Sequence, residues 1–204
     1  DHLGLCYDYG YGVDQDYEEA IKYIKLSAEQ GYPDAQCQLG YMYEYGQGVE
    51  QSYEKAMEYF QLAADQGDAE AQYYLGVSYE RGLGIEQDYE EAVKYYQLAA
   101  DQGFADAQNN LGLYYVNGLG VDQDYEKAVK YYKLAADQGL AIAQYNLGST
   151  YYHGLGVEQD YHKAMELYQL AADQGSTLAI NDIGWMYYKG DLVEQDYDLA
   201  VKYD

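Results

Sequence analysis

The same short segment returns along this chain at a fixed interval. It reads AQCQLG at residues 35–40 and AQYYLG at residues 71–76, and related segments start at Ala107, Ala143 and Ala179, each 36 residues after the last (71 − 35 = 36). A period of this size is typical of stacked small units that bury their apolar faces against their neighbours. We therefore predict an elongated stack. Such stacks present long continuous surfaces and seldom contain a catalytic pocket, which favours a binding function.

Each unit is predicted to be two helices joined by a short loop. In the third copy, the first helix is expected over about residues 69–80, because Ala71, Leu75, Gly76 and Tyr79 follow the spacing of one helical face. Glycine inside a helix costs about 1 kcal/mol relative to alanine. The return of this glycine in every unit therefore predicts close contact with another helix.

The second helix of the same unit is bounded by recognisable signals. Glycines at Gly82 and Gly84 predict a turn, because glycine adopts backbone angles that other residues resist. Asp88 can cap the following helix, and Glu91 three residues later predicts a capping box. Gly103 is the expected left-handed residue at the helix end.

Composition limits the partners. The chain has 204 residues, of which 36 are acidic and 11 basic, giving a formal charge of −25. This charge repels nucleic acid and anionic membranes, so we expect neither as a partner. We find no apolar run long enough to span a bilayer and no signal peptide. Cys6 and Cys37 lack zinc spacing, and two free thiols in a reducing, cytoplasmic compartment are favoured over a disulfide.

The repeated residues resemble the Sel-one-like repeat (SLR), a relative of the tetratricopeptide repeat with a longer loop between its helices. In the third copy the matching residues are Ala71, Leu75, Gly76, Tyr79, Gly82, Gly84, Ile85, Asp88, Tyr89, Ala92, Ala99, Ala100, Gln102 and Gly103. The resemblance implies an all-α solenoid, a right-handed superhelix of paired helices in which the first helices line the concave side. Members of this family act mostly as adaptors and scaffolds.

The domain is interpreted as a single array. It consists of a partial repeat at 1–34, repeats at 35–70, 71–106, 107–142 and 143–178, and a partial repeat at 179–204. Because the sequence starts and stops partway through a repeat, we interpret it as a fragment of a longer protein, whose preceding residues would carry any signal peptide.

If the first helices line a groove as in the family, positions 2, 5, 9, 12 and 13 of each first helix face it. These positions vary between copies while the framework stays constant, as a surface adapted to one ligand would. Tyrosine, tryptophan and arginine often dominate interface energetics. The alternative is an unconstrained solvent face in a tyrosine-rich chain. The predicted binding residues are Tyr41, Glu44, Tyr45, Tyr73, Glu80, Arg81, Asn109, Asn117, Tyr145, Tyr152, His153, Asn181, Trp185 and Tyr188.

Other chemistry is less well supported. Asp122, Asp124 and Glu126 resemble the opening of a calcium loop, but Lys127 and Lys133 occupy the places that need glycine and a carboxylate. The histidines His2, His153 and His162 share no ligand spacing. No cofactor or metal is therefore expected, and no nucleophile or acid–base set stands out.

Two functions remain open. The first is a non-enzymatic scaffold whose concave face binds a protein or peptide, with a basic or amphipathic segment favoured because acidic residues gather towards the amino-terminal half of that face. The second is a regulatory or targeting module of a longer protein that carries a catalytic or membrane domain elsewhere. An enzyme in its own right is disfavoured, because no convergent polar site is visible. The oligomeric state is not predicted.

Overall fold

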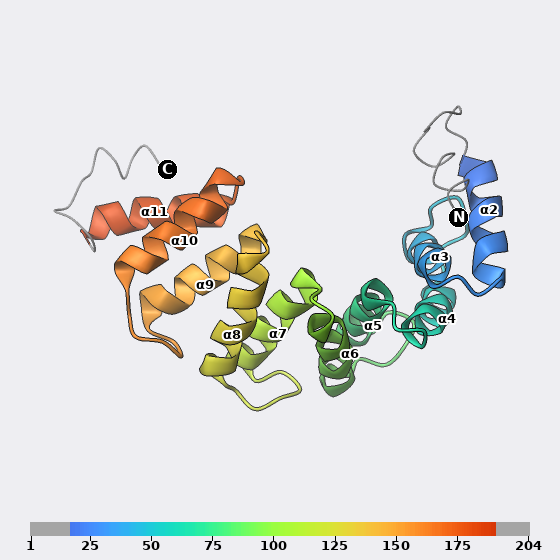
Figure 1. Ribbon diagram of the computed structural model, residues 1–204, viewed down its shortest axis with the longest axis horizontal. Coiled ribbons are helices and arrows are strands. Elements are labelled where there is room, and N and C mark those ends of the chain that lie inside the picture. Colours follow the sequence, from blue (N-terminus) through green and yellow to red (C-terminus); the bar gives the residue numbers. More distant parts are fainter. Residues whose placement is uncertain (1–16, 191–204) are drawn as a thin grey trace. The chain divides into compact units, whose positions relative to one another are not determined.

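The computed structural model describes residues 17–190, and throughout that range the regular structure is α-helical (Figure 1). The chain divides into two compact units, residues 1–102 and 103–204. The α/α solenoid predicted from the repeat is confirmed in each unit, because consecutive helices pack against one another in chain order.

The first unit contains five described helices: α2 (Tyr17–Glu29), α3 (Pro33–Tyr45), α4 (Tyr53–Ala64), α5 (Ala69–Arg81) and α6 (Tyr89–Asp101). The pairs α3–α4 and α5–α6 form the hairpins of two repeats, and α2–α3 and α4–α5 pack across repeat boundaries. The second unit is built alike, from α7 (Ala105–Asn117), α8 (Tyr125–Asp137), α9 (Ala141–His153), α10 (Tyr161–Asp173) and α11 (Thr177–Lys189).

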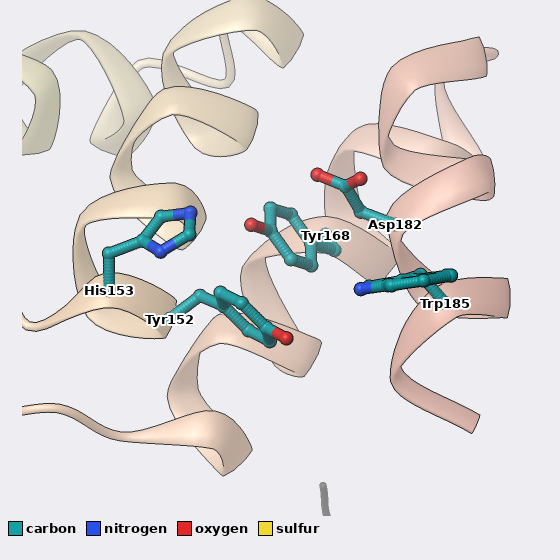
Figure 2. Close-up of a pocket in the computed structure, with 5 residues that line it drawn as sticks. All are labelled: Tyr152, His153, Tyr168, Asp182 and Trp185. Carbon is teal, nitrogen blue, oxygen red and sulfur yellow. The ribbon is translucent and has the colours of Figure 1, made fainter. Parts of the chain in front are cut away.

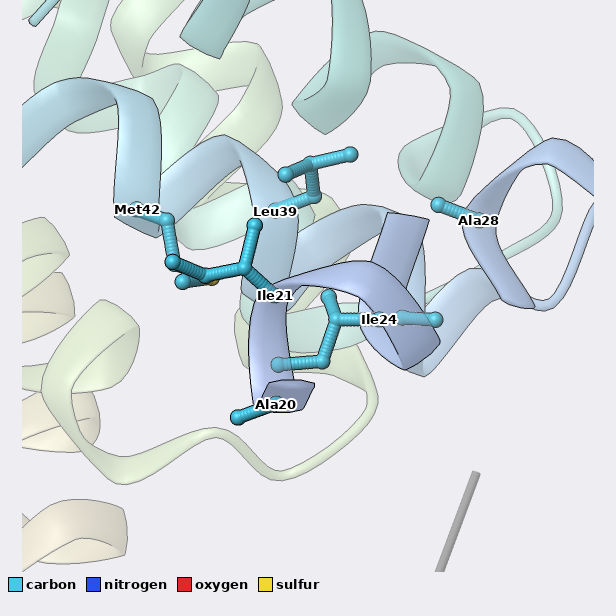
Figure 3. Close-up of a cluster of buried hydrophobic side chains, with 7 residues drawn as sticks. Ala20, Ile21, Ile24, Ala28, Leu39 and Met42 are labelled. Atoms are coloured by element: carbon cyan, nitrogen blue, oxygen red, sulfur yellow. The ribbon is translucent and has the colours of Figure 1, made fainter. Parts of the chain in front are cut away.

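The apolar core runs between successive helices. Figure 3 shows its first part, where Ile21, Ile24 and Ala28 of α2 meet Leu39 and Met42 of α3. Further clusters join α3, α4 and α5 in the first unit, and α9, α10 and α11 in the second. Within each unit, the inner helices such as α4 and α10 therefore bury residues against both the preceding and the following helix.

In α3, α5, α7 and α9, the glycine inside the first helix of a repeat lies against an aromatic ring of the second helix. A Cβ atom added at Gly76 would lie 2.6 Å from the Tyr96 ring, and one at Gly112 would lie 2.5 Å from the Tyr132 ring. Real Cβ atoms do not approach other atoms so closely. The prediction that this glycine marks a close helix–helix contact is confirmed.

The loop glycines are required by the backbone and by the neighbouring repeat. Gly82 and Gly84 have φ angles of 69° and 71°, in the left-handed region that favours glycine. A Cβ atom on Gly84 would also lie 2.7 Å from the carbonyl oxygen of Tyr53, at the start of α4 in the preceding repeat. The loop thus packs against the previous hairpin, which leaves no room for a side chain.

Of the two reciprocal hydrogen bonds of the capping box predicted at the start of α6, only the one to the Asp88 side chain forms. The Asp88 carboxylate accepts hydrogen bonds from the backbone N–H groups of Glu90 and Glu91. The reciprocal half of the capping box does not form: the Asp88 N–H donates to the Tyr79 carbonyl, and Glu91 pairs with Lys94 at 2.5 Å. A full capping box was therefore a wrong prediction, because the Tyr79 carbonyl of α5 supplies the acceptor for the Asp88 N–H.

Two sets of glutamines form recurring hydrogen bonds, the first between neighbouring repeats and the second within each repeat. One joins Gln66 to Gln36, and equivalent pairs follow at 36-residue intervals, with donor–acceptor distances of 2.7–2.8 Å. Gln36 also donates to the Ala28 carbonyl at the end of α2, so it links two successive second helices. The other set, exemplified by Gln87, donates to the last carbonyls of the first helix, here that of Glu80 at 2.6 Å. Neither set was predicted from the sequence.

Within residues 17–190, none of the helices combines the length and apolar character needed to cross a membrane. His2, Cys6 and the outer parts of both predicted partial repeats lie outside the described residues. Cys37 is a free, buried cysteine on α3.

Candidate protein-binding surface

The predicted binding residues all lie on the first helices of the repeats, α3 and α5 in the first unit and α7, α9 and α11 in the second. These helices belong to two compact units, and each unit carries one candidate surface. We call them the α3–α5 surface and the α9–α11 surface, after the helices that carry most of the predicted residues.

The α3–α5 surface is centred on tyrosines. The ring centroids of Tyr41 and Tyr45 are 4.5 Å apart, and Tyr41 also lies 5.8 Å from Tyr74. Tyr73 extends the group, with its ring 5.6 Å from Tyr74 and 5.8 Å from Tyr96. Tyr45 is 52% exposed and Tyr41 is half-buried. The structure therefore brings three of the predicted tyrosines into one connected cluster.

The acidic residues of this surface are less accessible than the sequence suggested. Glu44 is only 4% exposed, and its Oε2 atom is buried without a hydrogen-bond partner. Burial raises the pKa of Glu44, while the Tyr45 hydroxyl and the more distant Arg81 act in the opposite direction. Glu80 is half-buried and accepts a hydrogen bond from the Tyr96 hydroxyl. Arg81 is exposed at the end of α5.

The two predicted asparagines of α7 have local structural roles. Asn109 is 7% exposed, and its Oδ1 accepts a hydrogen bond from the Asn146 amide of α9 at 2.9 Å. Asn117 is exposed, and its amide donates to the Leu113 carbonyl of its own helix at 2.8 Å. Asn109 thus helps join α7 to α9 and offers little surface to a partner.

The α9–α11 surface contains a pocket of about 170 Å³ (Figure 2). Its lining comes from three helices: Tyr152 and His153 of α9, Tyr168 of α10, and Asp182 and Trp185 of α11. Trp185 is 50% exposed, and Tyr168 is almost fully buried. The pocket is therefore an aromatic depression with one carboxylate in its wall.

Further predicted residues surround this pocket. Burial, together with the negative charge of the nearby Asp182 carboxylate, raises the pKa of Tyr145 to about 12. Tyr188 stacks on Trp185 with ring centroids 5.4 Å apart, and Lys189 places its Nζ 5.1 Å from the centre of the Trp185 ring. Asn181 is exposed on α11, one helical turn before Trp185.

Two lining residues, Tyr168 and Asp182, were not predicted. Tyr168 belongs to the aromatic residues that pack on the helix glycine in every repeat, so its type carried no information about a pocket. For Asp182, the sequence did contain a signal that could have identified it as a candidate. Its equivalents in the other repeats are Gln38, Tyr74, Asn110 and Asn146, so an acid appears at this position in the last repeat alone.

A second exposed feature lies on the second helices. One leucine of each repeat is exposed to solvent at the same position: Leu26, Leu62, Leu98, Leu134 and Leu170. Because this leucine recurs unchanged in every repeat, it belongs to the common framework. The exposed aromatics Tyr45, Trp185 and Tyr188 do not recur in this way.

The acidic loop that resembled a calcium site has a structural explanation. The Asp124 carboxylate accepts from the Lys127 N–H and pairs with the Lys127 ammonium at 3.3 Å, which lowers the pKa of Asp124. Among the residues that the structure describes, no group of three or more histidine, cysteine or acidic side chains is arranged to hold a metal ion. His153 and His162 are exposed.

Comparisons with known proteins agree with this architecture. The family model described as "Sel1 repeat" matches residues 2–32, 33–68, 69–104, 105–140, 141–176 and 177–203. The chain is similar to a protective antigen of uropathogenic Escherichia coli that displays an SLR fold, with 36% identity and a TM-score of 0.89 over 99% of this chain and 43% of the other. It is also similar to a Sel1 repeat protein from Oxalobacter formigenes, with 32% identity and a TM-score of 0.89 over 99% of this chain and 81% of the other.

An immunity protein from Pseudomonas aeruginosa shares the fold, with 23% identity and a TM-score of 0.62 over 100% of this chain and 80% of the other. The chain thus spans less than half the length of the E. coli antigen but most of the other two proteins. No curated protein matches it.

Proposed function

Because the chain belongs to the Sel1 repeat family, we propose that it is a non-enzymatic scaffold that binds a protein segment on the exposed side of its first helices. Proteins with Sel1 repeats generally act as protein–protein interaction scaffolds and are typically not catalytic. Beyond this general role, the proposal assigns binding to the exposed side of the first helices.

The observation that carries this proposal is the placement of exposed aromatic side chains that differ between repeats. Tyr45 on α3 and Trp185 and Tyr188 on α11 are large and exposed, and their positions hold other residue types in most of the repeats. Large aromatic side chains lose little conformational entropy on binding and often dominate interface energetics. The framework residues recur while these positions vary, as expected of a surface adapted to a particular partner.

The charge of the chain favours a partner of opposite sign. With a formal charge of −25, the protein attracts basic segments over distances of about 8–10 Å at physiological salt. A segment with basic and apolar residues satisfies both the charge and the exposed aromatics. Nucleic acid is disfavoured by the same charge.

Selection of binding peptides provides the test. A library of random peptides displayed on phage is selected on the intact chain, and the affinity of the selected peptides is measured by calorimetry. In the double variant Tyr145→Ala/Trp185→Ala, binding is expected to weaken by about 2–4 kcal/mol, the range typical of interface hot spots. The matched control is Leu134→Ser/Leu170→Ser, which removes two exposed leucines from the second helices of the same unit.

Circular dichroism verifies that both variants remain folded. If the leucine variant loses the peptides while the aromatic variant keeps them, the binding face lies on the second helices and our assignment is wrong. If no peptide binds either surface of the folded chain, the scaffold proposal itself fails.

A further inference from the structure

We infer that the pocket between α9, α10 and α11 binds an arginine side chain of the partner, with the guanidinium held between aromatic rings and the Asp182 carboxylate. This inference rests on the proposed function, because it names the side chain that anchors the bound segment. It is carried by the composition, size and charge of the pocket.

The aromatic rings provide the first argument. Tyr152, Tyr168 and Trp185 line the pocket from three different helices, and in Figure 2 they surround a common space. Aromatic faces attract cations, and tryptophan does so most strongly. The protein already uses this property, because the Lys189 ammonium lies 5.1 Å from the centre of the Trp185 ring.

The carboxylate provides the second argument. Asp182 is half-buried, and Figure 2 shows its carboxylate extending from α11 towards the side chains of α9 and α10. Tyr145 lies near enough for the Asp182 charge to act on its hydroxyl, and no hydrogen bond to the Asp182 carboxylate is found among the described residues. Two carboxylate oxygens accept about four hydrogen bonds, so capacity remains for the two parallel N–H groups of a guanidinium.

Size and charge select among ligands. A volume of about 170 Å³ is below the roughly 300–1,000 Å³ of pockets for small molecules and cofactors, but it suits one side chain. A neutral aromatic side chain would cover Asp182 without compensating its charge, which is costly. A guanidinium is planar, stacks on aromatic rings and pairs with a carboxylate through two hydrogen bonds, whereas a lysine ammonium does only part of this.

The experiment uses short peptides as probes and Trp185 as reporter. Trp185 is the only tryptophan in the sequence, so its fluorescence and its indole N–H resonance report on this pocket alone. The intact chain is titrated with acetyl-Gly-Arg-Gly-amide, with the lysine analogue, and with the citrulline analogue, which has the shape of arginine without its charge. We expect the arginine peptide to bind with a Kd about tenfold or more below that of the citrulline peptide, and also below that of the lysine peptide.

Variants locate the effect. Asp182→Asn preserves the shape of the side chain and is expected to abolish the advantage of arginine over citrulline. The matched control Asp173→Asn neutralises an exposed acid of α10, outside the pocket, and is expected to leave that advantage unchanged. If Asp182→Asn fails to fold, the comparison of the three peptides on the unaltered chain decides alone.

The inference is overturned if the arginine peptide binds no more tightly than the citrulline peptide or no more tightly than the lysine peptide. It is also overturned if Asp182→Asn keeps the preference for arginine over citrulline. A Trp185 signal that does not respond to any peptide at millimolar concentration overturns it too. The proposed function is tested independently, because selected peptides can bind the first helices without placing an arginine in this pocket. Conversely, the pocket can bind arginine even where selected peptides prove insensitive to the aromatic double variant.

Discussion

The contact between Gly112 of α7 and Tyr132 of α8 offers a direct test of how closely the hairpin helices pack. A Cβ atom at position 112 would lie 2.5 Å from the Cδ1 and Cε1 atoms of Tyr132 and 3.0 Å from Cγ. Tyr132 is 3% exposed, so its ring is enclosed on other sides and has little room to move. Gly112→Ala therefore forces the ring or one of the helices to shift.

Two opposing terms set the size of the effect. Overpacking of a core costs about 1–3 kcal/mol. Replacing glycine by alanine within a helix gains about 1 kcal/mol. We therefore expect Gly112→Ala to lower the free energy of unfolding by up to about 2 kcal/mol. In a Tyr132→Ala background the clash is absent, and the same substitution is expected to raise that free energy by up to about 1 kcal/mol.

A double-mutant cycle measures this difference. Urea unfolding followed by far-ultraviolet circular dichroism gives the free energy of unfolding for the unaltered chain, both single variants and the double variant. We expect a coupling energy of about 1–3 kcal/mol between positions 112 and 132. If Gly112→Ala has the same effect with and without the Tyr132 ring, the ring is not what excludes a side chain at position 112, and our account of the repeated glycine is wrong.

Three further predictions concern buried polar groups. Phe60→Tyr should stabilise the first unit by about 1–3 kcal/mol in thermal or urea unfolding, because a hydroxyl there would reach Glu44 as Tyr96 reaches Glu80; a loss of stability would refute this. Burial raises the pKa of Glu44, so folding favours its protonated form and stability falls as the pH rises above about 4.5. Glu44→Gln should reduce this fall between about pH 5 and pH 7, and an unchanged pH profile would contradict the assignment. Gln138→Ala should cost about 1–3 kcal/mol by leaving the buried Gln108 oxygen without its donor. Gln169→Ala, which removes only a hydrogen bond to the exposed Asp173, should cost less than about 0.5 kcal/mol; equal costs would refute a special role for the glutamine pairs.

The backbone of the fold was predictable because its signals are local and repeated. Ala71 and Leu75 mark the buried face of α5, and Gly82 and Gly84 mark the loop, with a spacing that recurs in the other repeats except the last, where Leu192 replaces the second glycine. The glutamine pairs were not predictable in the same way. Gln102 and Gln72 are 30 residues apart, and glutamine is common on exposed helix faces, so only the packing of neighbouring repeats reveals that they meet.

The sequence places the candidate binding residues on the first helices, but it does not predict how accessible each of them is. Counting along the first helix placed Glu44 and Trp185 on one side of the repeat, yet Glu44 is buried and Trp185 is exposed. The difference arises from neighbours that the position number does not contain. Glu44 lies in a repeat where Phe60 replaces the tyrosine whose hydroxyl would satisfy it, and its burial follows from packing against other helices.

The carboxylates of Glu44, Glu80 and Asp182 therefore have two different roles. Glu44 is buried and Glu80 accepts a hydrogen bond from the Tyr96 hydroxyl, so their charge contributes to the general negative field more than to any direct contact. That field is long-ranged and weakened by salt, and it acts mainly on the rate at which a basic segment arrives. Asp182 instead stands in an aromatic pocket, where partial burial strengthens a direct charge pair. We therefore expect added salt to slow association throughout, whereas Asp182→Asn should mainly accelerate dissociation of an arginine-containing peptide. Stopped-flow measurements of Trp185 fluorescence separate the two rates, and a variant that changed only the association rate would place Asp182 in the general field and outside the anchoring contact.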